Sequence, residues 1–131
     1  MPGTLASDKL AAELYDGTAI TSKTTTTGSA VRVDWPLDCE VEMTFGTMSG
    51  SSGTMDVEIQ ASDASNFGTF VSLGRFAQET EAATGTKVLS VYCAKKYMRA
   101  VIVTGGSTVT SFTPTVVVRP CNYQRTPDTT A

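Results

Sequence analysis

The chain has 131 residues, which suits one domain large enough to bury a core without metal ions or disulfides. Only 18% of the residues are charged and the net charge is −3, so a nucleic-acid backbone is not an expected partner. The sequence contains no histidine, which excludes Ser-His-Asp and Cys-His catalytic sites. It also has no apolar run of the roughly 20 residues that cross a bilayer as a helix. No membrane partner and no enzymatic activity are therefore expected.

Residues 1–29 are expected to form an N-terminal arm that is extended or partly helical. The stretch Asp8–Tyr15 (DKLAAELY) could form one or two helical turns ended by Gly17, and the polar stretch TAITSKTTTTGS then favours an extended chain. A disordered terminus is the alternative. No secretory signal is recognised at the start of the sequence, which favours assembly in a cytoplasm. The apolar side chains that the arm could bury against a partner or its own domain are Leu5, Leu10, Leu14, Tyr15 and Ile20.

From residue 30 onward apolar and polar residues alternate, which is typical of strands with one wet face. Turn residues recur at intervals of about 8–12 residues, and no helical segments separate the strands. The sequence therefore predicts an all-β domain over residues 30–120, an antiparallel β-sandwich or jelly roll of seven or eight strands. Residues 121–131 are expected to be a flexible tail. The expected strands span residues 30–35, 39–45, 54–61, 69–76, 86–93, 97–103 and 109–120.

Several connections can also be predicted. Strands 39–45 and 54–61 are expected to pair as a hairpin through the glycine-rich loop 46–53. Strand 86–93 is apolar on both faces, which favours a central position. The segment TGGST at 104–108 is expected to be a turn rather than a phosphate-binding loop, because it lacks the lysine of that motif. Pro114 favours an edge or a bulge for the last strand, and the glycine in 69–76 suggests a bulge.

The three cysteines do not describe a disulfide framework, because their number is odd and their spacing wide. Cys39 and Cys93 fall within apolar strand patterns and are expected to be small core residues. Cys121 is expected to be more exposed, and one disulfide remains an alternative. No cysteine pair has the spacing of zinc ligands, so neither a metal nor another cofactor is expected.

Four carboxylates, Glu40, Glu42, Asp56 and Glu58, are expected on the outer face of the predicted hairpin. Glu42 and Glu58 become cross-strand neighbours if the register of the hairpin pairs these two positions. Like charges in such positions destabilise a sheet unless a partner compensates them. Three interpretations are open. The face could be solvated and flanked by Arg99 or Lys87, it could meet basic residues of a partner protein, or it could hold a cation or a catalytic carboxylate pair.

The aromatic residues offer a second kind of contact site. Phe67 and Phe70 flank the tight segment NFGTF, where they could anchor an interface or close one end of a barrel. Trp35 continues the apolar face of Val31 and Val33, which favours a core position over a sugar-stacking platform.

Two segments resemble small proteins of phage particles. The first is TMDVEIQASDASNFGTFVSLGRF, with a Gln-x-Ser-Asp step at Gln60–Asp63 followed by Asn66 and Phe67. The second is KKYMRAVIVTGGSTVTSFTPTVVV at 95–118, with Lys96–Ala100 in a Lys-Tyr-x-Arg strand. A third similar segment runs from Leu14 through Asp16-Gly17-x-Ala19-Ile20-Thr21 and precedes a Thr-rich run. Together these patterns resemble the jelly-roll cement proteins that decorate the heads of tailed phages, and the long polar stretch TSKTTTTGS departs from the family pattern.

The resemblance implies a structural protein of the capsid surface that binds junctions between subunits of the major capsid protein. It also implies a homo-oligomer, with a trimer favoured, an N-terminal arm that contributes contacts, and a location in the virion. The resemblance transfers no catalytic residues. Two alternatives remain: another virion component such as a tail, neck or adaptor protein, and a carbohydrate-binding β-sandwich module with Trp35, Tyr97 or Phe67 as the platform.

Overall fold

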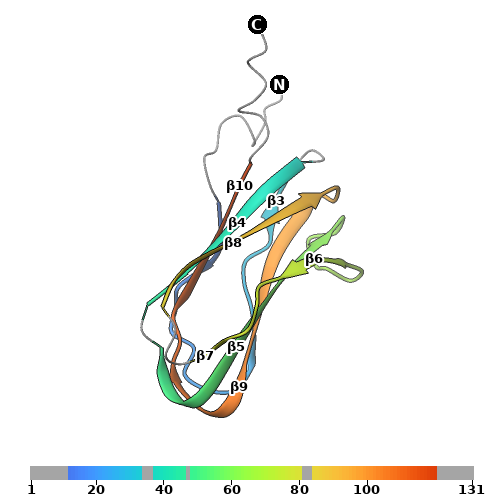
Figure 1. The fold of residues 1–131 in the computed structure, drawn as a ribbon. Coiled ribbons are helices and arrows are strands. Elements are labelled where there is room, and N and C mark those ends of the chain that lie inside the picture. Colours follow the sequence, from blue (N-terminus) through green and yellow to red (C-terminus); the bar gives the residue numbers. More distant parts are fainter. Residues whose placement is uncertain (1–11, 34–36, 47, 81–83, 121–131) are drawn as a thin grey trace, which may run out of the picture.

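The computed structural model describes residues 12–33, 37–46, 48–80 and 84–120, and within them the chain forms antiparallel strands and no helix (Figure 1). These residues accordingly hold no helical segment of the length and apolarity that a bilayer crossing requires. The strands are β1 (Ala12–Asp16), β2 (Thr25–Thr27), β3 (Val31–Arg32), β4 (Leu37–Phe45), β5 (Ser49–Ser62), β6 (Val71–Arg75), β7 (Glu79–Thr80), β8 (Gly85–Cys93), β9 (Tyr97–Ser111) and β10 (Pro114–Pro120).

The strands form two sheets that face each other as a sandwich (Figure 1). One sheet has the order β1-β10-β4-β8 and the other the order β2-β9-β5-β6, with β3 added to β9 and β7 added to β5. Early strands thus pair with late ones: β1 with β10, β2 with β9, β4 with β8 and β5 with β6. This nested pairing is the topology of a jelly roll, in which one long antiparallel ribbon folds over itself. The predicted all-β sandwich is confirmed.

The core lies between the two sheets, where alternate side chains of every long strand point inward. From β4 these are Cys39, Val41, Met43 and Phe45, and from β5 they are Met55, Val57, Ile59 and Ala61. Strand β9 adds Met98, Ala100 and Ile102, and β10 adds Val116 and Val118. All of these side chains are at most 7% exposed. The period-two pattern in the sequence therefore identified the core face of each of these strands.

The helical turns predicted for Asp8–Tyr15 are wrong for the described part of that segment, because Ala12–Asp16 is strand β1. Leu14 is fully buried while its neighbour Glu13 is exposed, and the register with β10 shifts at this point, between Glu13 and Tyr15. Strand β10 supplies hydrogen-bond partners for the backbone of β1. A helix as short as this segment would be only marginally stable in water. Leu5 and Leu10 lie outside the described residues.

The Thr-rich stretch that follows is extended, as expected, and it lies along β9. Thr24 and Thr104 exchange two backbone hydrogen bonds, and the buried Thr104 hydroxyl donates to the Ser22 carbonyl at 2.8 Å. Strand β2 then continues the pairing, and Ile20 forms an isolated bridge with Phe112. The part of the expected arm that is described is thus held to the two sheets by hydrogen bonds.

The predicted hairpin of strands 39–45 and 54–61 is wrong, because β4 and β5 belong to different sheets. Strand β5 begins at Ser49, inside the segment expected to be a loop, and the chain passes from one sheet to the other between the end of β4 at Phe45 and the start of β5. Alternation shows which face of a strand is wet, but it does not show which strand lies beside it. The pairing partners of β4 are β8 and β10, and those of β5 are β9, β6 and β7.

The predicted turn at 104–108 is also wrong, because β9 continues through it to Ser111. Gly106 pairs with Gly53 and has a φ of 86°, and a Cβ at Gly106 would overlap the Ser52 carbonyl. Glycine therefore lets two paired strands approach closely and bend together, rather than end. Figure 1 shows β5 and β9 curling side by side at the lower end of the sandwich.

Two expectations about strand position are overturned as well. Strand β8, expected to be central, is an edge strand of its sheet, and its outward Val88 and Tyr92 are 53% and 57% exposed. Strand β10 is central, and Pro114 is its first residue, where the missing N–H does not interrupt the ladder. The bulge expected in 69–76 is confirmed by a register shift between Ile59 and Gln60, opposite Gly74 and Ser72.

Candidate interaction surface

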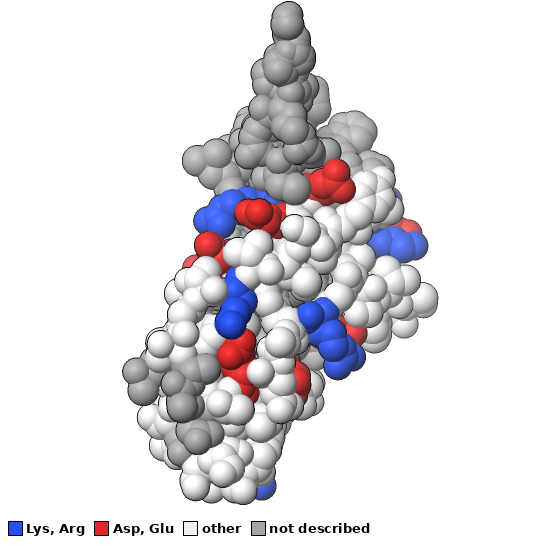
Figure 2. Space-filling view, in the orientation of Figure 1, with Lys and Arg blue, Asp and Glu red and all other residues white. Residues whose placement is uncertain are grey.

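The outward side chains of the two sheets form two separate surfaces. The four-strand face consists of Glu13, Asp16, Asp38, Glu40, Glu42, Thr44, Thr86, Val88, Ser90, Tyr92, Thr115, Val117 and Arg119. The six-strand face consists of Thr25, Thr27, Arg32, Asp56, Glu58, Gln60, Ser72, Arg75, Tyr97, Arg99, Val101 and Val103. Figure 2 looks toward the side of the sandwich near β8 and β6 and shows charged residues as small groups of mixed sign between stretches of uncharged surface.

The four predicted carboxylates do not form one patch. Glu40 and Glu42 lie on the four-strand face, whereas Asp56 and Glu58 lie on the six-strand face, with the core between them. The prediction that Glu42 and Glu58 are cross-strand neighbours is therefore wrong. It depended on the hairpin that the fold does not contain. Among the described residues, no three His, Cys, Asp or Glu side chains come close enough together to hold a metal ion.

On the four-strand face, Arg119 compensates one of the two glutamates. Its Nη1 donates to Glu42 Oε1 at 2.9 Å, diagonally across β10 and β4. Both side chains are more than a third exposed, so this ion pair is worth at most about 1 kcal/mol. Arg119 was missed as a site residue because its place beside β4 follows from strand order, which the sequence does not reveal.

On the six-strand face, Glu58 belongs to a connected polar network. Gln60 Nε2 donates to Glu58 Oε1 at 2.9 Å, and Arg75 Nη2 lies 3.5 Å from Glu58 Oε2. Burial raises the pKa of Glu58, but hydrogen bonds from Gln60 and Ser72 and the charge of Arg75 outweigh it, so its pKa lies below the ordinary value. Asp56 accepts a hydrogen bond from Gln78 at 2.9 Å.

Arg99 extends this network toward an aromatic cluster. Its Nε donates to Gln60 Oε1 at 2.9 Å, and its guanidinium lies 4.2 Å from the centre of the Phe67 ring and 5.6 Å from that of Phe70. Gln60 is only 5% exposed, so it links Glu58 and Arg99 away from solvent. The sequence placed Glu58, Arg99 and Phe67 among the candidate residues but missed Gln60, whose alternation with Glu58 was the available signal.

The two phenylalanines have different environments. Phe67 is 4% exposed and covered by Arg99, whereas Phe70 is 46% exposed. Phe67 has a φ of 51°, which is a strained conformation for a bulky aromatic residue. Its burial and its stacking on Arg99 offset that strain. Phe67 therefore closes the end of the sheet and does not offer a platform for a sugar. The Tyr97 ring is likewise covered by an arginine, Arg32.

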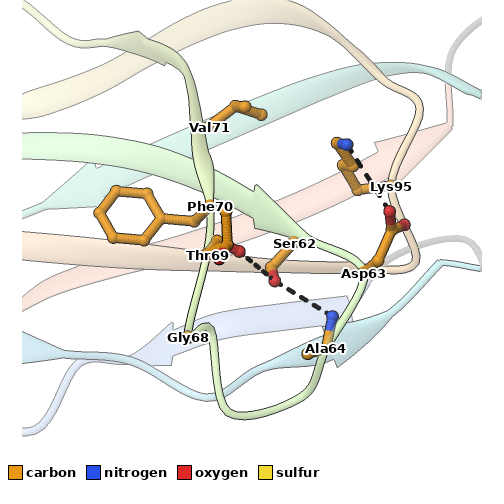
Figure 3. A pocket seen from close by; sticks show the side chains of 8 residues that line it. All are labelled: Ser62, Asp63, Ala64, Gly68, Thr69, Phe70, Val71 and Lys95. Carbon is orange, nitrogen blue, oxygen red and sulfur yellow. Dashed lines mark hydrogen bonds and ion pairs between the residues drawn. The ribbon is translucent and has the colours of Figure 1, made fainter.

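The loop between β5 and β6 is held in one shape by its own hydrogen bonds. Ser62 Oγ donates to the Thr69 carbonyl at 2.6 Å and accepts from the Ala64 amide at 3.1 Å, and Gly68 N donates to Asn66 Oδ1 at 2.9 Å. Beside this loop lies an open hollow of about 270 Å³. Figure 3 shows the Asp63–Lys95 ion pair, 3.6 Å long, on one side of the hollow and Thr69 and Phe70 on the other.

Three of the apolar residues predicted for the arm lie in the described part of the chain, and all three pack into or against the core. Leu14 and Ile20 are core residues, 0% and 4% exposed. Tyr15 packs against the core, and its hydroxyl donates to the Thr18 carbonyl at 2.6 Å. Burial raises the pKa of Tyr15, and the neighbouring Asp16 charge raises it further. These three residues of the described chain contribute to the fold of their own sandwich.

Cys39 and Cys93 are fully buried, which confirms their expected place in the core. Burial raises the pKa of the Cys93 thiol, which donates a weak hydrogen bond to the Lys95 carbonyl at 3.4 Å. A buried thiol of this kind is unreactive. Cys121 and Trp35 lie outside the described residues.

No protein-family model matches the chain, and no curated protein sequence matches it. Solved structures share its fold at low identity. The PBSX exported protein XepA is 19% identical with a TM-score of 0.55, and the match covers 91% of this chain and 39% of that one. A chain of infectious bursal disease virus, Gx strain, is 13% identical with a TM-score of 0.54, over 90% of this chain and 36% of that one.

The VP2 subviral particle of infectious bursal disease virus is similar as well, at 14% identity and a TM-score of 0.52, over 95% of this chain and 38% of that one. The chain thus spans about two-fifths of the length of the structures it matches. At these identities the likeness establishes a shared fold: this chain has the β-sandwich found in chains of virus particles and in XepA.

Proposed function

We propose that this protein is a structural component of a virus particle, a decoration protein that binds the outer surface of a tailed-phage head. Its partner is the major capsid protein, whose subunit junctions it stabilises. The observation that carries the proposal is the jelly-roll pairing of early with late strands, together with the likeness of almost the whole chain to chains of virus particles. The sequence resemblance to head-decoration proteins supports the same role.

The physical basis of such a role is contact area. A protein that binds only the assembled shell stabilises that shell by mass action, and it needs no reactive group. Both sheets offer broad outer faces whose threonine and valine side chains are short, so they lose little conformational freedom when a partner covers them. We propose that the chain acts as a homo-oligomer, with a trimer favoured, and that it has no enzymatic activity.

The test is co-sedimentation of the purified protein with empty phage heads. Saturable binding at micromolar concentration, with a stoichiometry fixed by the number of subunit junctions, is expected. Heads that carry the protein should also resist heating or chelation better than bare heads do. A protein that stays in the supernatant at every concentration contradicts the proposal, and labelling confined to tails in virion images would favour a tail, neck or adaptor protein.

One observation favours a second candidate, a carbohydrate-binding module. Phe70 is 46% exposed beside the hollow that Asp63 and Lys95 border, and jelly rolls also occur in lectins. An aromatic ring next to polar groups suits a sugar ring. A glycan array that gives clear hits, lost in Phe70→Ala and kept in Tyr92→Ala, would support this candidate over the decoration role.

A further inference from the structure

The edges of the two sheets are not equally protected. An edge strand presents unpaired backbone N–H and C=O groups to other chains, and proteins usually shorten, bend or cover such strands. Strands β2, β3 and β7 are three residues long or less, and β6 bulges between Ser72 and Gly74. Strand β1 has a register shift and is covered where Ser29 N donates to the Leu14 carbonyl at 3.0 Å. These edges are therefore poor templates for another strand.

Strand β8 has none of these devices. It is nine residues long and contains no proline. Its register with β4 runs without a shift from the pair Leu37 and Cys93 to the pair Phe45 and Gly85. Within the described part of the chain, the backbone of β8 is hydrogen-bonded to β4 and to no other strand. Every second residue of β8 therefore directs its N–H and C=O groups away from the sheet.

The β8 edge is also accessible. Successive side chains of a strand point to opposite faces, yet Thr86, Lys87 and Val88 are all exposed, so neither face is covered at this end of the strand. Lys87 is the one charged residue of β8, and its Nζ lies 3.9 Å from Glu79 Oε2, so its charge is balanced within the protein. A strand that approaches this edge meets no unbalanced charge.

The hollow beside the β5–β6 loop lies at one end of this edge. Lys95, two residues after the end of β8, lines it from one side, and Phe70 and Val71 line it from the other (Figure 3). Phe70 and Val71 are 46% and 44% exposed, so the hollow has an apolar wall that is open to solvent. Its volume of about 270 Å³ is below the roughly 300–1,000 Å³ of most small-molecule pockets, which suits a single side chain. A chain that runs along β8 toward Cys93 reaches this hollow.

We propose that the β8 edge and the hollow together bind one extended segment of a capsid subunit, which adds to the four-strand sheet as a further strand and places an apolar side chain in the hollow. In this kind of binding, main-chain hydrogen bonds supply affinity and a side-chain pocket supplies specificity. The inference deepens the capsid binding of the proposed function and rests on it. Each copy uses one edge, so the contact is compatible with a closed trimer.

The side chains next to the edge indicate the chemistry of the bound segment. Val88 and Tyr92 point outward from β8 and are 53% and 57% exposed. Aromatic and β-branched residues stabilise a sheet when they lie opposite each other on neighbouring strands. The capsid segment is therefore expected to carry β-branched or aromatic residues at the alternate positions that lie beside Val88 and Tyr92.

A second copy of β8 fits the edge less well than a capsid segment does. Full antiparallel pairing of two β8 strands would bring Thr84, Gly85 and Thr86 of one copy to the hollow of the other. These residues are small, so the apolar wall of the hollow would stay uncovered. Such a pair is also two-fold symmetric and closes as a dimer.

The first 11 residues of the same copy cannot pair along the whole β8 edge. They precede β1, which lies at the opposite edge of the four-strand sheet, three strand spacings or roughly 14 Å from β8. A chain of this length spans at most about 40 Å, and pairing along all of β8 takes about 30 Å. The remaining length is shorter than the distance that the chain would have to cross.

One test fills the hollow. Ala64 is exposed and lines the hollow, whereas Ser65 is exposed in the same loop and does not line it. Ala64→Trp is expected to weaken binding to empty phage heads by roughly tenfold or more in co-sedimentation. The matched control Ser65→Trp should bind within about threefold of wild type. Circular dichroism establishes that both variants fold, and normal binding by Ala64→Trp would overturn the role of the hollow.

Hydrogen exchange, resolved to single amides by mass spectrometry, tests the edge itself. In the free protein every second amide of β8 should exchange fast, because it has no partner, while the amides bonded to β4 exchange slowly. When the protein binds empty heads, the fast set should slow by roughly tenfold or more. Docking through the flat face of the sheet would leave this alternate set fast.

The outcomes separate the inference from the proposed function. A protein that binds heads while its β8 amides stay fast overturns the inference alone, and if Ala64→Trp then also loses binding, the hollow holds a side chain or a sugar without an added strand. Slow β8 amides in the protein alone, with protection that rises with concentration, show that another copy occupies the edge and overturn it as well. A protein that ignores heads overturns the proposed function and the capsid segment with it.

Discussion

The outer faces of the two sheets use similar residues with different consequences. On the four-strand face Glu42 and Arg119 form a direct ion pair at 2.9 Å in which both partners are largely open to water. On the six-strand face Glu58 reaches Arg99 through Gln60, which is 5% exposed and lies near the loop between β5 and β6. Water screens the first pair, while the second network is shielded from it.

The comparison indicates that a charged residue on the outside of a sheet contributes more to the free energy of unfolding when neighbouring side chains bury it. An exposed pair contributes at most about 1 kcal/mol, because water solvates its members nearly as well when they separate. A covered donor or acceptor that loses its partner costs about 1–3 kcal/mol, because water cannot replace the lost bond. The predictions below test this contrast, from the largest expected effect to the smallest.

Both faces exist only if the two sheets share one core, and Leu14→Ala tests that premise. Leu14 is fully buried, so the substitution should lower the free energy of unfolding by about 2–5 kcal/mol. Glu13→Ala, at the exposed neighbouring position, should change it by less than about 0.5 kcal/mol. Urea denaturation followed by tryptophan fluorescence measures both. Equal, small effects would mean that β1 does not contribute to the core in solution.

The aromatic cover of the six-strand face is tested by Phe67→Ala. Removal of the buried ring uncovers the Arg99 guanidinium and leaves a space, so we expect a loss of about 3 kcal/mol. Phe70→Ala removes the more exposed ring beside the same arginine and should cost less than about 1 kcal/mol. Thermal unfolding of the two variants measures the two losses. A larger loss for Phe70→Ala than for Phe67→Ala would contradict the prediction that Phe67 covers the Arg99 network.

Gln60→Ala breaks the network itself. It deprives Arg99 Nε and Glu58 Oε1 of their shared partner, so a loss of about 2 kcal/mol is expected. The matched change on the open face is Glu42→Ala, which removes the ion pair with Arg119 and should cost at most about 1 kcal/mol. If both variants unfold at the same urea concentration, burial of the network does not add to the stability of the fold.

The smallest effect concerns pH. Since the folded-state pKa of Glu58 lies below its unfolded value, its charged form adds stability above the ordinary glutamate pKa of about 4.3. That stability is lost as the pH falls through the folded-state pKa. Wild type should therefore lose more stability between pH 5 and pH 3 than Glu58→Gln does, with Gln60→Ala between them. Parallel curves for wild type and Glu58→Gln would show that Glu58 is not held in this network.

Much of the fold could be predicted from residue order. Alternation identified the inward residues of the long strands, including Val41, Met43, Val57 and Ile59, because side chains on a strand have a period of two whatever strand lies beside it. Helical spacing misjudged the described part of the predicted helical segment, residues 12–15, which pairs with β10 and buries Leu14. A short segment adopts the secondary structure in which its backbone groups find hydrogen-bond partners, and for β1 those partners are on β10.

The candidate site was predicted only in part. Glu58, Arg99 and Phe67 do lie together on one face, but Asp56 and Glu58 were wrongly joined with Glu40 and Glu42. The error came from the expectation that the loop 46–53 closes a hairpin, whereas the chain passes to the other sheet between Phe45 and Ser49. Arg119 acts through Glu42 on a strand far away in sequence, and sequence spacing says nothing about that neighbour.

The sequence by itself determined the class of the fold, the inward side of most strands and the lack of histidine chemistry, since these follow from residue type and local alternation. The tertiary structure alone decided strand order, and with it the separation of Glu40 and Glu42 from Asp56 and Glu58 onto opposite faces. The physical reason is that backbone hydrogen bonds between strands are the same for every pair of strands. Only the packing of the whole core selects which strands become neighbours.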